Sequence, residues 1–121
     1  MENDSTMYEL ATKFFSALER GDANTVRQCY SPSVRVWNTL QQEALTGSEH
    51  IHLLESGFFA ILADRKFTDP RMNTFAGGFV RQHILIARRV ADGQTIHLPI
   101  CLVCKVEQGL FTLVEEYMNR P

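Results

Sequence analysis

The stretch Phe79–Val106, FVRQHILIARRV-ADGQ-TIHLPICLVCKV, decides the fold. Two long runs rich in Val, Ile and Leu flank the dipeptide Asp92-Gly93, which is a strong signal for a hairpin turn. The runs predict antiparallel strands over Phe79–Val90 and Thr95–Val106. Long antiparallel strands with helices gathered on one face make an α+β domain.

Turn residues separate further predicted strands on both sides of this hairpin. Gly77-Gly78 precedes it, and a strand over Lys66–Phe75 comes before that turn, interrupted at Asp69-Pro70. Gln108-Gly109 follows the hairpin, and Leu110–Met118 is the last predicted strand. The C-terminal half therefore has the pattern of a meander of antiparallel strands.

The N-terminal part of the chain has clear helix signals. Thr6 with Glu9 forms a capping-box pattern, which predicts a first helix that begins at Thr6. Gly21 ends this helix, because glycine readily adopts the left-handed conformation found after helix C-termini. Asp22 is the expected cap of a short second helix that runs to about Tyr30.

One early strand and a third helix complete the predicted elements. Val34–Trp37 alternates as a strand does, and Gly47-Ser48 opens the third helix with Ser48 as its expected cap. Three helices with one early strand, followed by a meander, predict an α+β fold. We expect residues 1–121 to form a single domain.

Composition excludes several classes of protein. The chain has 121 residues, 45% of them hydrophobic and 21% charged, with a net charge of −2, as in ordinary globular proteins. It has no basic tract for nucleic acid and no apolar run long enough for a membrane helix. Its polar, acidic start lacks the pattern of a secretory signal, and three cysteines are an odd count, so we expect a cytoplasmic protein with free thiols.

The order and spacing of several short motifs resemble one known family. They are Arg20-Gly21-Asp22, Tyr30 before a strand, Asp92-Gly93, Gly109 and the closing Val114–Asn119. Together they resemble the nuclear transport factor 2-like superfamily, in its SnoaL-like and ketosteroid-isomerase-like branch, over nearly the whole chain. The resemblance implies a cone-shaped fold in which a strongly curved, mostly antiparallel sheet wraps around a long N-terminal helix. It also implies an apolar ligand pocket and a homodimer formed through the sheet.

The resemblance includes the ketosteroid isomerases, but this chain does not have their catalytic residues. The position of their general-base Asp is Asn38, which cannot abstract a proton. The position of their oxyanion-binding Tyr is Phe14, and the strand region of their buried Asp is Ile100–Leu102. We therefore do not expect isomerisation by that mechanism.

Two other catalytic sets of the superfamily are also incomplete here. Limonene epoxide hydrolases combine an Arg with two Asp in the pocket, and this chain offers Arg81 without the paired aspartates on its strands. Scytalone dehydratases use two His, and here His83 and His97 lie on adjacent predicted strands. Counting outward from the hairpin turn puts His97 opposite Arg88, so we expect the two histidines to lie apart along the sheet.

The period of two along a strand predicts which side chains face the pocket. On the first hairpin strand the more apolar set is expected on the concave face: Val80, Gln82, Ile84 and Ile86. The opposite set then lies on the convex face, unless a bulge reverses the alternation. Together with the matching residues of the next strand, this set is expected to form the dimer surface: Arg81, His83, Leu85, His97, Cys101 and Val103.

Glu115 and Glu116 are adjacent, so their side chains point to opposite faces of the last strand. The glutamate that faces an apolar pocket would have a raised pKa and could act as an acid or base, whereas the other would be a solvated charge. The candidate catalytic residues are therefore His83, Glu115 and Glu116. The expected pocket-lining residues are Phe14, Tyr30, Trp37, Asn38, Phe58, Leu102 and Tyr117.

No metal or cofactor is expected. Cys101 and Cys104 are three apart on a strand and point to opposite faces, so they cannot hold one metal together. His50 and His52 are two apart on a helix, which also separates them. The chain lacks zinc-ligand spacing and a Gly-rich phosphate loop.

Two hypotheses of function remain open, and so does the question of enzymatic activity. The first is a SnoaL-like protein that binds a small hydrophobic molecule, including an isomerase, dehydratase or cyclase-type enzyme on a cyclic or polyketide-like substrate. The alternative is a non-catalytic dimeric binding or assembly domain with a structural apolar pocket. A carboxylate or histidine that faces the cavity favours the first, and a purely apolar cavity favours the second.

Overall fold

The structure, a computed structural model that describes residues 3–119, has the expected α+β class. Helices α1 (Asp4–Arg20) and α2 (Ala23–Gln28) precede strands β1 (Tyr30–Asn38) and β2 (Leu45–Thr46). A second helical stretch consists of α3 (Gly47–Leu53), the π-helical turn η1 (Leu54–Phe58) and α4 (Phe59–Ile61). The remaining strands are β3 (Leu62–Phe75), β4 (Gly78–Arg89), β5 (Thr95–Glu107) and β6 (Leu110–Met118).

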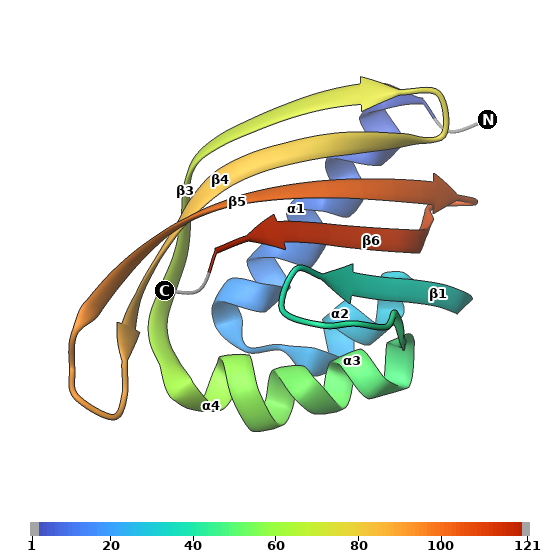
Figure 1. The fold of residues 1–121 in the computed structure, drawn as a ribbon. Coiled ribbons are helices and arrows are strands. Elements are labelled where there is room, and N and C mark those ends of the chain that lie inside the picture. Colours follow the sequence, from blue (N-terminus) through green and yellow to red (C-terminus); the bar gives the residue numbers. More distant parts are fainter. Residues whose placement is uncertain (1–2, 120–121) are drawn as a thin grey trace.

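The strands form one curved sheet in the order β2-β1-β6-β5-β4-β3. The β1–β6 pair is parallel and the other pairs are antiparallel. Figure 1 shows α1 running along the concave face of the sheet, with α3 and α4 across one end. The helices of residues 3–119 all lie on one side, so none of them covers the convex face (Figure 1).

Helix α1 begins earlier than the sequence predicts. Asn3 is the N-cap, and its side-chain oxygen accepts a hydrogen bond from the backbone N–H of Thr6 at 2.8 Å. The predicted cap Thr6 lies instead within the first turn, because asparagine caps a helix at least as well as threonine does. The C-terminus is as predicted: Gly21 has a φ of 73°, in the left-handed region.

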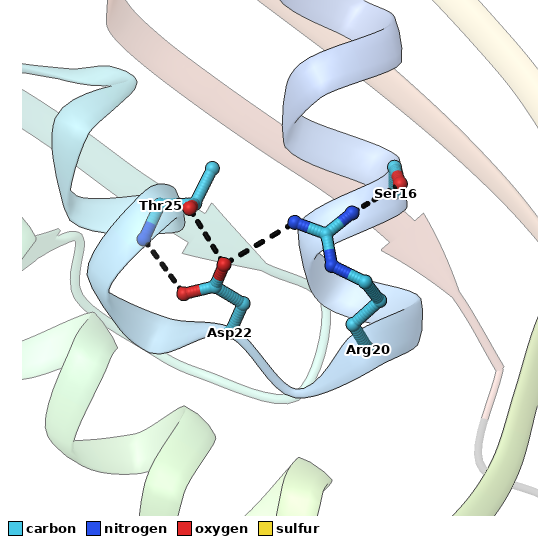
Figure 2. Close-up of polar contacts among 4 residues, drawn as sticks. All are labelled: Ser16, Arg20, Asp22 and Thr25. Atoms are coloured by element: carbon cyan, nitrogen blue, oxygen red, sulfur yellow. Dashed lines mark hydrogen bonds and ion pairs between the residues drawn. The ribbon is translucent and has the colours of Figure 1, made fainter.

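The junction between α1 and α2 is held by the Asp22 carboxylate (Figure 2). One carboxylate oxygen accepts a hydrogen bond from the Thr25 backbone N–H at 3.0 Å, and the other accepts one from the Thr25 hydroxyl at 2.6 Å. Arg20 lies 3.2 Å from the second oxygen and also donates to the Ser16 hydroxyl. The capping role predicted for Asp22 is confirmed.

Arg65 on β3 binds the end of α1. Its Nε donates to the carbonyl of Leu18 at 3.0 Å, and Nη2 donates to the carbonyl of Glu19 at 3.2 Å. Nη1 donates to the carbonyls of Leu62 and, at 3.5 Å, Phe59. The last carbonyls of a helix have no partner within the helix, so one guanidinium here satisfies two of them and fixes α1 to the α4–β3 connection.

The predicted cap of α3 is wrong by two residues. Thr46 is the N-cap, and its hydroxyl accepts a hydrogen bond from the Glu49 backbone N–H at 3.2 Å. The Glu49 carboxylate accepts one from the Thr46 N–H at 2.8 Å, which completes a capping box. Ser48 lies inside the first turn, because the Thr46–Glu49 pair satisfies two free N–H groups and a Ser48 cap would satisfy only one.

Strand β3 contains two irregularities that bend it. The pairing with β4 shifts between Ala63 and Lys66 and again between Thr68 and Arg71. Asp64 and Asp69 both have a φ of 54° at these points. The interruption predicted at Asp69-Pro70 is therefore a bulge within one continuous strand, which adds curvature to the sheet.

The predicted inward face of β4 is wrong. His83 and Leu85 are buried at 2% exposure, whereas Gln82 is exposed on the other face. His83 contacts Phe15 on α1 and Phe67 on β3, with ring centroids 5.3 Å and 4.5 Å away. Both faces of β4 carry apolar residues, so hydrophobicity alone does not identify the inner one, and aromatic contacts bury the polar His83 there.

The β4–β5 hairpin has a longer turn than predicted. Arg88 pairs with Thr95, and His97 pairs with Ile86 instead of the predicted Arg88. A register change of two residues leaves every side chain on its original face. His97 therefore stays on the convex face, as predicted, while His83 lies on the concave face, and the two histidines are separated by the sheet.

Candidate functional site

A cavity of about 380 Å³ lies between the concave face of the sheet and the helices. Most of its walls are apolar, and its polar residues are Asn38, Gln41, His50 and Glu116. Leu40 and Leu53 line the cavity and are also 44% and 45% exposed, so they mark its mouth. The other lining residues come from α1, β1, the α3–η1 stretch and strands β3, β5 and β6: Phe14, Leu18, Val36, Leu54, Gly57, Phe58, Phe67, Ile100, Leu102, Val114 and Met118.

Glu116 is the carboxylate that faces this cavity. It pairs with Leu102 on β5 and with Asn38 on β1, and all three residues line the cavity. The adjacent Glu115 pairs with Val103 and Trp37 on the convex face. The alternation of the strand thus assigns the two glutamates to opposite sides of the sheet.

The surroundings of Glu116 favour its protonated form. Among residues 3–119, no side chain makes a hydrogen bond or ion pair with its carboxyl group, and no lysine or arginine lines the cavity. Burial raises the pKa of Glu116 to about 7, because the cavity walls replace the water that would stabilise the charge. A carboxyl group with such a pKa can both release and accept a proton near neutral pH.

Asn38 is held beside Glu116 by its own backbone loop. Its side-chain oxygen accepts a hydrogen bond from the Leu40 backbone N–H at 2.8 Å. A backbone N–H can only donate, so the contacting atom is the amide oxygen, and the amide nitrogen is the group left to donate to other partners. Asn38 therefore offers a donor next to the acidic side chain of Glu116.

His50 forms a second polar point of the cavity. Its Nδ1 lies 2.6 Å from the hydroxyl oxygen of Tyr30, which is buried at the start of β1. Burial lowers the pKa of His50 to about 4 and raises the pKa of Tyr30 well above its usual value. Both groups are therefore neutral around pH 7.

Gln41 adds an acceptor from the loop after β1. Its side-chain oxygen is buried and has no hydrogen-bond partner within residues 3–119. A buried acceptor without a partner costs free energy, which a donor on a bound molecule or a water would recover. The cavity thus combines apolar walls with four polar side chains of different chemistry.

A family model, the SnoaL-like domain, matches residues 11–114. The chain belongs to the SnoaL-like family. A search of curated proteins finds no match.

Solved structures agree with the fold of this SnoaL-like domain. A proposed polyketide cyclase from Xanthomonas campestris has a TM-score of 0.87 and 16% identity, over 98% of this chain and 93% of that one. A proposed isomerase from Bacillus subtilis has a TM-score of 0.86 and 11% identity, over 98% and 90%. An LEH-like epoxide hydrolase from M. tuberculosis has a TM-score of 0.78 and 16% identity, over 95% and 84%. At these identities the similarity concerns the fold alone.

The SnoaL-like cavity contains some of the predicted lining residues and not others. Phe14, Asn38, Phe58 and Leu102 line it. The prediction is corrected for three residues. Trp37 and Tyr117 lie on the convex face with their rings 5.4 Å apart, because each is one position away from an inward residue. Tyr30 packs against Phe14 and contacts His50, so it supports the wall without forming part of it.

His83, a predicted catalytic candidate, lies outside the 380 Å³ cavity. Its Nδ1 accepts a hydrogen bond from Arg81 Nε at 3.1 Å, and the Arg81 guanidinium stacks on the Phe15 ring at 4.1 Å. Burial and the nearby Arg81 lower the pKa of His83 to about 3. His83 is therefore a neutral core residue around pH 7, separated from the cavity by Phe67.

Sequence reasoning missed Gln41 and His50 as parts of the site. The sequence pattern relates His50 only to His52, with which it cannot form a metal site. Yet His50 precedes the buried Leu54 by four residues and so shares its helix face. That spacing was the available signal. Gln41 lies in an irregular loop, where neither helical nor strand periodicity indicates a direction.

The described part of the chain contains neither a metal-binding cluster nor a membrane-spanning helix. Residues 3–119 contain no group of three His, Cys, Asp or Glu side chains placed to hold a metal ion. Over the same range, every helix is too short or too polar to cross a bilayer.

Proposed function

We propose that this SnoaL-like domain binds a small, mostly apolar, cyclic or polyketide-like substrate and that Glu116 transfers a proton on it. Reactions of this type include isomerisation, dehydration and cyclisation. The observation that carries the proposal is the carboxyl group of Glu116, which reaches an apolar cavity without an ion-pair partner among residues 3–119. Such a group is poised for proton transfer near neutral pH.

The proposed chemistry begins with Glu116 as a carboxylate. It removes a proton from a carbon next to a substrate carbonyl, which leaves an enolate and a neutral Glu116. The enolate then regains the proton at another carbon, or expels a hydroxyl group that takes the proton, or attacks a second carbonyl whose oxygen takes the proton from Glu116. The Asn38 amide nitrogen, on the neighbouring strand, is placed to donate to the substrate oxygen.

This function uses a different position from that of the ketosteroid isomerases. The residues at their three catalytic positions are Asn38, Phe14 and the apolar Ile100–Leu102, whereas the acidic group here is on β6. The absence of cationic residues from the described cavity walls favours a neutral substrate, since a carboxylate substrate would face Glu116 without compensation.

Hydrogen–deuterium exchange tests the proton transfer directly. Decalone, a fused bicyclic ketone, is incubated with the protein in deuterium oxide at pH 7, and the loss of its α-proton signals is followed by NMR. We expect exchange above the buffer rate for the wild type and for Glu115→Gln. For Glu116→Gln we expect the protein-dependent rate to fall by about 100-fold or more. Equal rates for Glu116→Gln and the wild type, or a wild-type rate equal to that of buffer, would contradict the proposal.

A homodimer through the convex face of the sheet is our second proposal, and it also fits the alternative of a non-catalytic binding or assembly domain. None of the helices in the described part of the chain covers this face, yet it carries half-buried apolar side chains on two central strands: Val80, Ile84, Ile86, Cys101 and Val103. Trp37 and Tyr117 extend the apolar area onto β1 and β6. A second copy of the chain could cover such a surface about a two-fold axis.

A further inference from the structure

We propose that His50 presents its Nε2–H to the cavity as a fixed hydrogen-bond donor, that Tyr30 sets this tautomer, and that the cavity therefore selects a neutral ligand with a carbonyl oxygen. The proposal rests on the binding role of the cavity in the proposed function. It adds a positioning residue, Tyr30, and a second donor for the carbonyl oxygen of the ligand, His50 Nε2–H.

The contact between His50 and Tyr30 fixes one edge of the imidazole ring. The Tyr30 hydroxyl oxygen lies 2.6 Å from His50 Nδ1, and the two ring centroids are 5.9 Å apart. His50 lines the cavity, whereas Tyr30 is 8% exposed and does not. Among residues 3–119, Nε2 of His50 has no hydrogen-bond partner, and it is not a fully buried atom, so a ligand can reach it. Tyr30 therefore contacts the ring from behind the wall, and Nε2 is the nitrogen that a ligand can reach.

The need of each buried donor for an acceptor decides which nitrogen of the His50 ring carries the proton. If His50 Nδ1 carried it, Nδ1–H would donate to the Tyr30 oxygen, and the buried Tyr30 O–H would need another acceptor. Within residues 3–119, the Tyr30 hydroxyl has no other hydrogen bond. A buried donor without an acceptor is costly, whereas a Tyr30 O–H that donates to Nδ1 satisfies both groups. Nδ1 is then the acceptor, and the proton of the neutral ring is on Nε2.

The charge state of the pair supports a neutral donor. Burial keeps both His50 and Tyr30 uncharged around pH 7. The nearby Glu116 raises the pKa of Tyr30 further, which also keeps the hydroxyl protonated. Two other titratable groups on the same helix are engaged elsewhere: Glu49 is part of the α3 cap, and His52 is exposed to solvent. The Nε2–H donor thus keeps its proton over the range in which Glu116 changes charge.

The polar groups of the cavity then define the ligand. His50 and Asn38 offer N–H donors, Gln41 offers an amide oxygen that accepts, and Glu116 offers a carboxyl group. A carboxylate ligand would be repelled by ionised Glu116. An ammonium ligand would be attracted by Glu116 but would leave the two N–H donors without an acceptor. A ketone or lactone carbonyl accepts from the donors without either conflict. The apolar walls contact the rest of such a molecule.

Long-range proton–nitrogen NMR on ¹⁵N-labelled protein tests the tautomer without any ligand. We expect His50 in the wild type to show a protonated Nε2 and an unprotonated Nδ1 at pH 7, with His50→Gln and His52→Gln as assignment controls. Tyr30→Phe should convert this single tautomer into a mixture, while His83 keeps its spectrum. A protonated Nδ1 in the wild type would overturn the proposal, and that measurement does not depend on the folding of any variant.

Ligand titration tests the selectivity. Adding decalone should shift the His50 Nε2–H signal, and adding decalin, the hydrocarbon of the same shape, should leave it in place. His50→Phe should weaken decalone binding roughly tenfold, the effect of one lost hydrogen bond, and leave decalin binding unchanged. Failure of decalone to shift the signal, or equal shifts from both compounds, would contradict the ligand class. Loss of deuterium exchange with an intact Nε2–H shift would instead refute only proton transfer by Glu116.

Discussion

The side chain of Glu116 lies among apolar and neutral residues, and the free energy of ionising its carboxyl group depends on these neighbours. Leu102 and Val114 share the cavity wall with it, and the nearby Asn38 and His50 are neutral. Ionising a carboxyl group in such surroundings sacrifices solvation that no described cation replaces. The charge on Glu116 is therefore coupled to the stability of the whole domain.

The pH dependence of stability should reveal this coupling. The pKa of Glu116 is about 7 in the folded state, against 4.5 for an unperturbed glutamate, so the folded state binds the proton more tightly. Protonated Glu116 therefore contributes about 3 kcal/mol to the free energy of unfolding. This contribution is fully present below pH 4.5 and is lost as the pH rises through about 7. In urea denaturation, the wild type should lose this amount relative to Glu116→Gln between pH 4.5 and pH 8. Glu115→Gln should parallel the wild type, and a pH-independent difference for Glu116→Gln would contradict the assigned environment.

Which glutamate faces the cavity could be predicted only in part. Alternation established that Glu115 and Glu116 lie on opposite faces, but not which face is inner. The pairing of β6 with β1 and β5 decides this, because Asn38 and Leu102 are inward at the same level. The contact between Tyr30 and His50 was beyond sequence reasoning, since it joins a strand to a helix whose relative placement depends on the whole fold.

At the scale of elements, the start of α3 gives a direct comparison between two candidate caps. Thr46→Ala removes the hydroxyl that accepts from Glu49 N–H and should destabilise the protein by about 1 kcal/mol. Ser48→Ala, the matched control, should change the free energy of unfolding by less than about 0.5 kcal/mol. Urea denaturation of both variants at one pH measures the difference. A larger loss for Ser48→Ala would show that the helix begins where the sequence predicted.

Helix and strand positions were largely predictable, while their ends and faces were not. Gly21 and Asp22 were identified because each satisfies a specific backbone requirement at one position. The caps Asn3 and Thr46 compete with the nearby Thr6 and Ser48, which have the same chemistry, so sequence preference alone does not separate them. The inner face of β4 was misassigned because the rings that bury His83 come from α1 and β3.

At the scale of the whole molecule, the uncovered face of the sheet leads to a test of assembly. Ile84 lies near the middle of β4 and faces away from the helices. Sedimentation equilibrium at micromolar concentration should give a dimer for the wild type and a monomer for Ile84→Lys. Val90→Lys makes the same change at an exposed position of the β4–β5 turn and should remain dimeric. A monomeric wild type would rule out the proposed dimer under these conditions.

The fold of the whole domain followed from the order of its elements. Three helices and an early strand before a meander leave few arrangements, and the resemblance to the SnoaL-like branch indicated the one observed. The polar residues of the cavity could not be predicted in the same way. They come from four separate segments, and whether each one lines the cavity depends on the direction in which its side chain points. Asn38 was anticipated as a polar wall residue, and Glu116 was anticipated as one of two alternatives with Glu115.

The contacts of Arg65 imply that motion in this domain is shared between distant segments. One guanidinium binds the carbonyls of Leu18 and Glu19 at the end of α1 and that of Leu62 at the start of β3. Fraying of the last turn of α1 would therefore remove two acceptors of Arg65 and loosen the connection between α4 and β3, and loss of that connection would in turn free the end of α1. Leu18 lines the cavity, so the same event would open the wall of the site. Backbone amides on these two segments should then exchange with solvent as one cooperative unit, although more than 40 residues separate them.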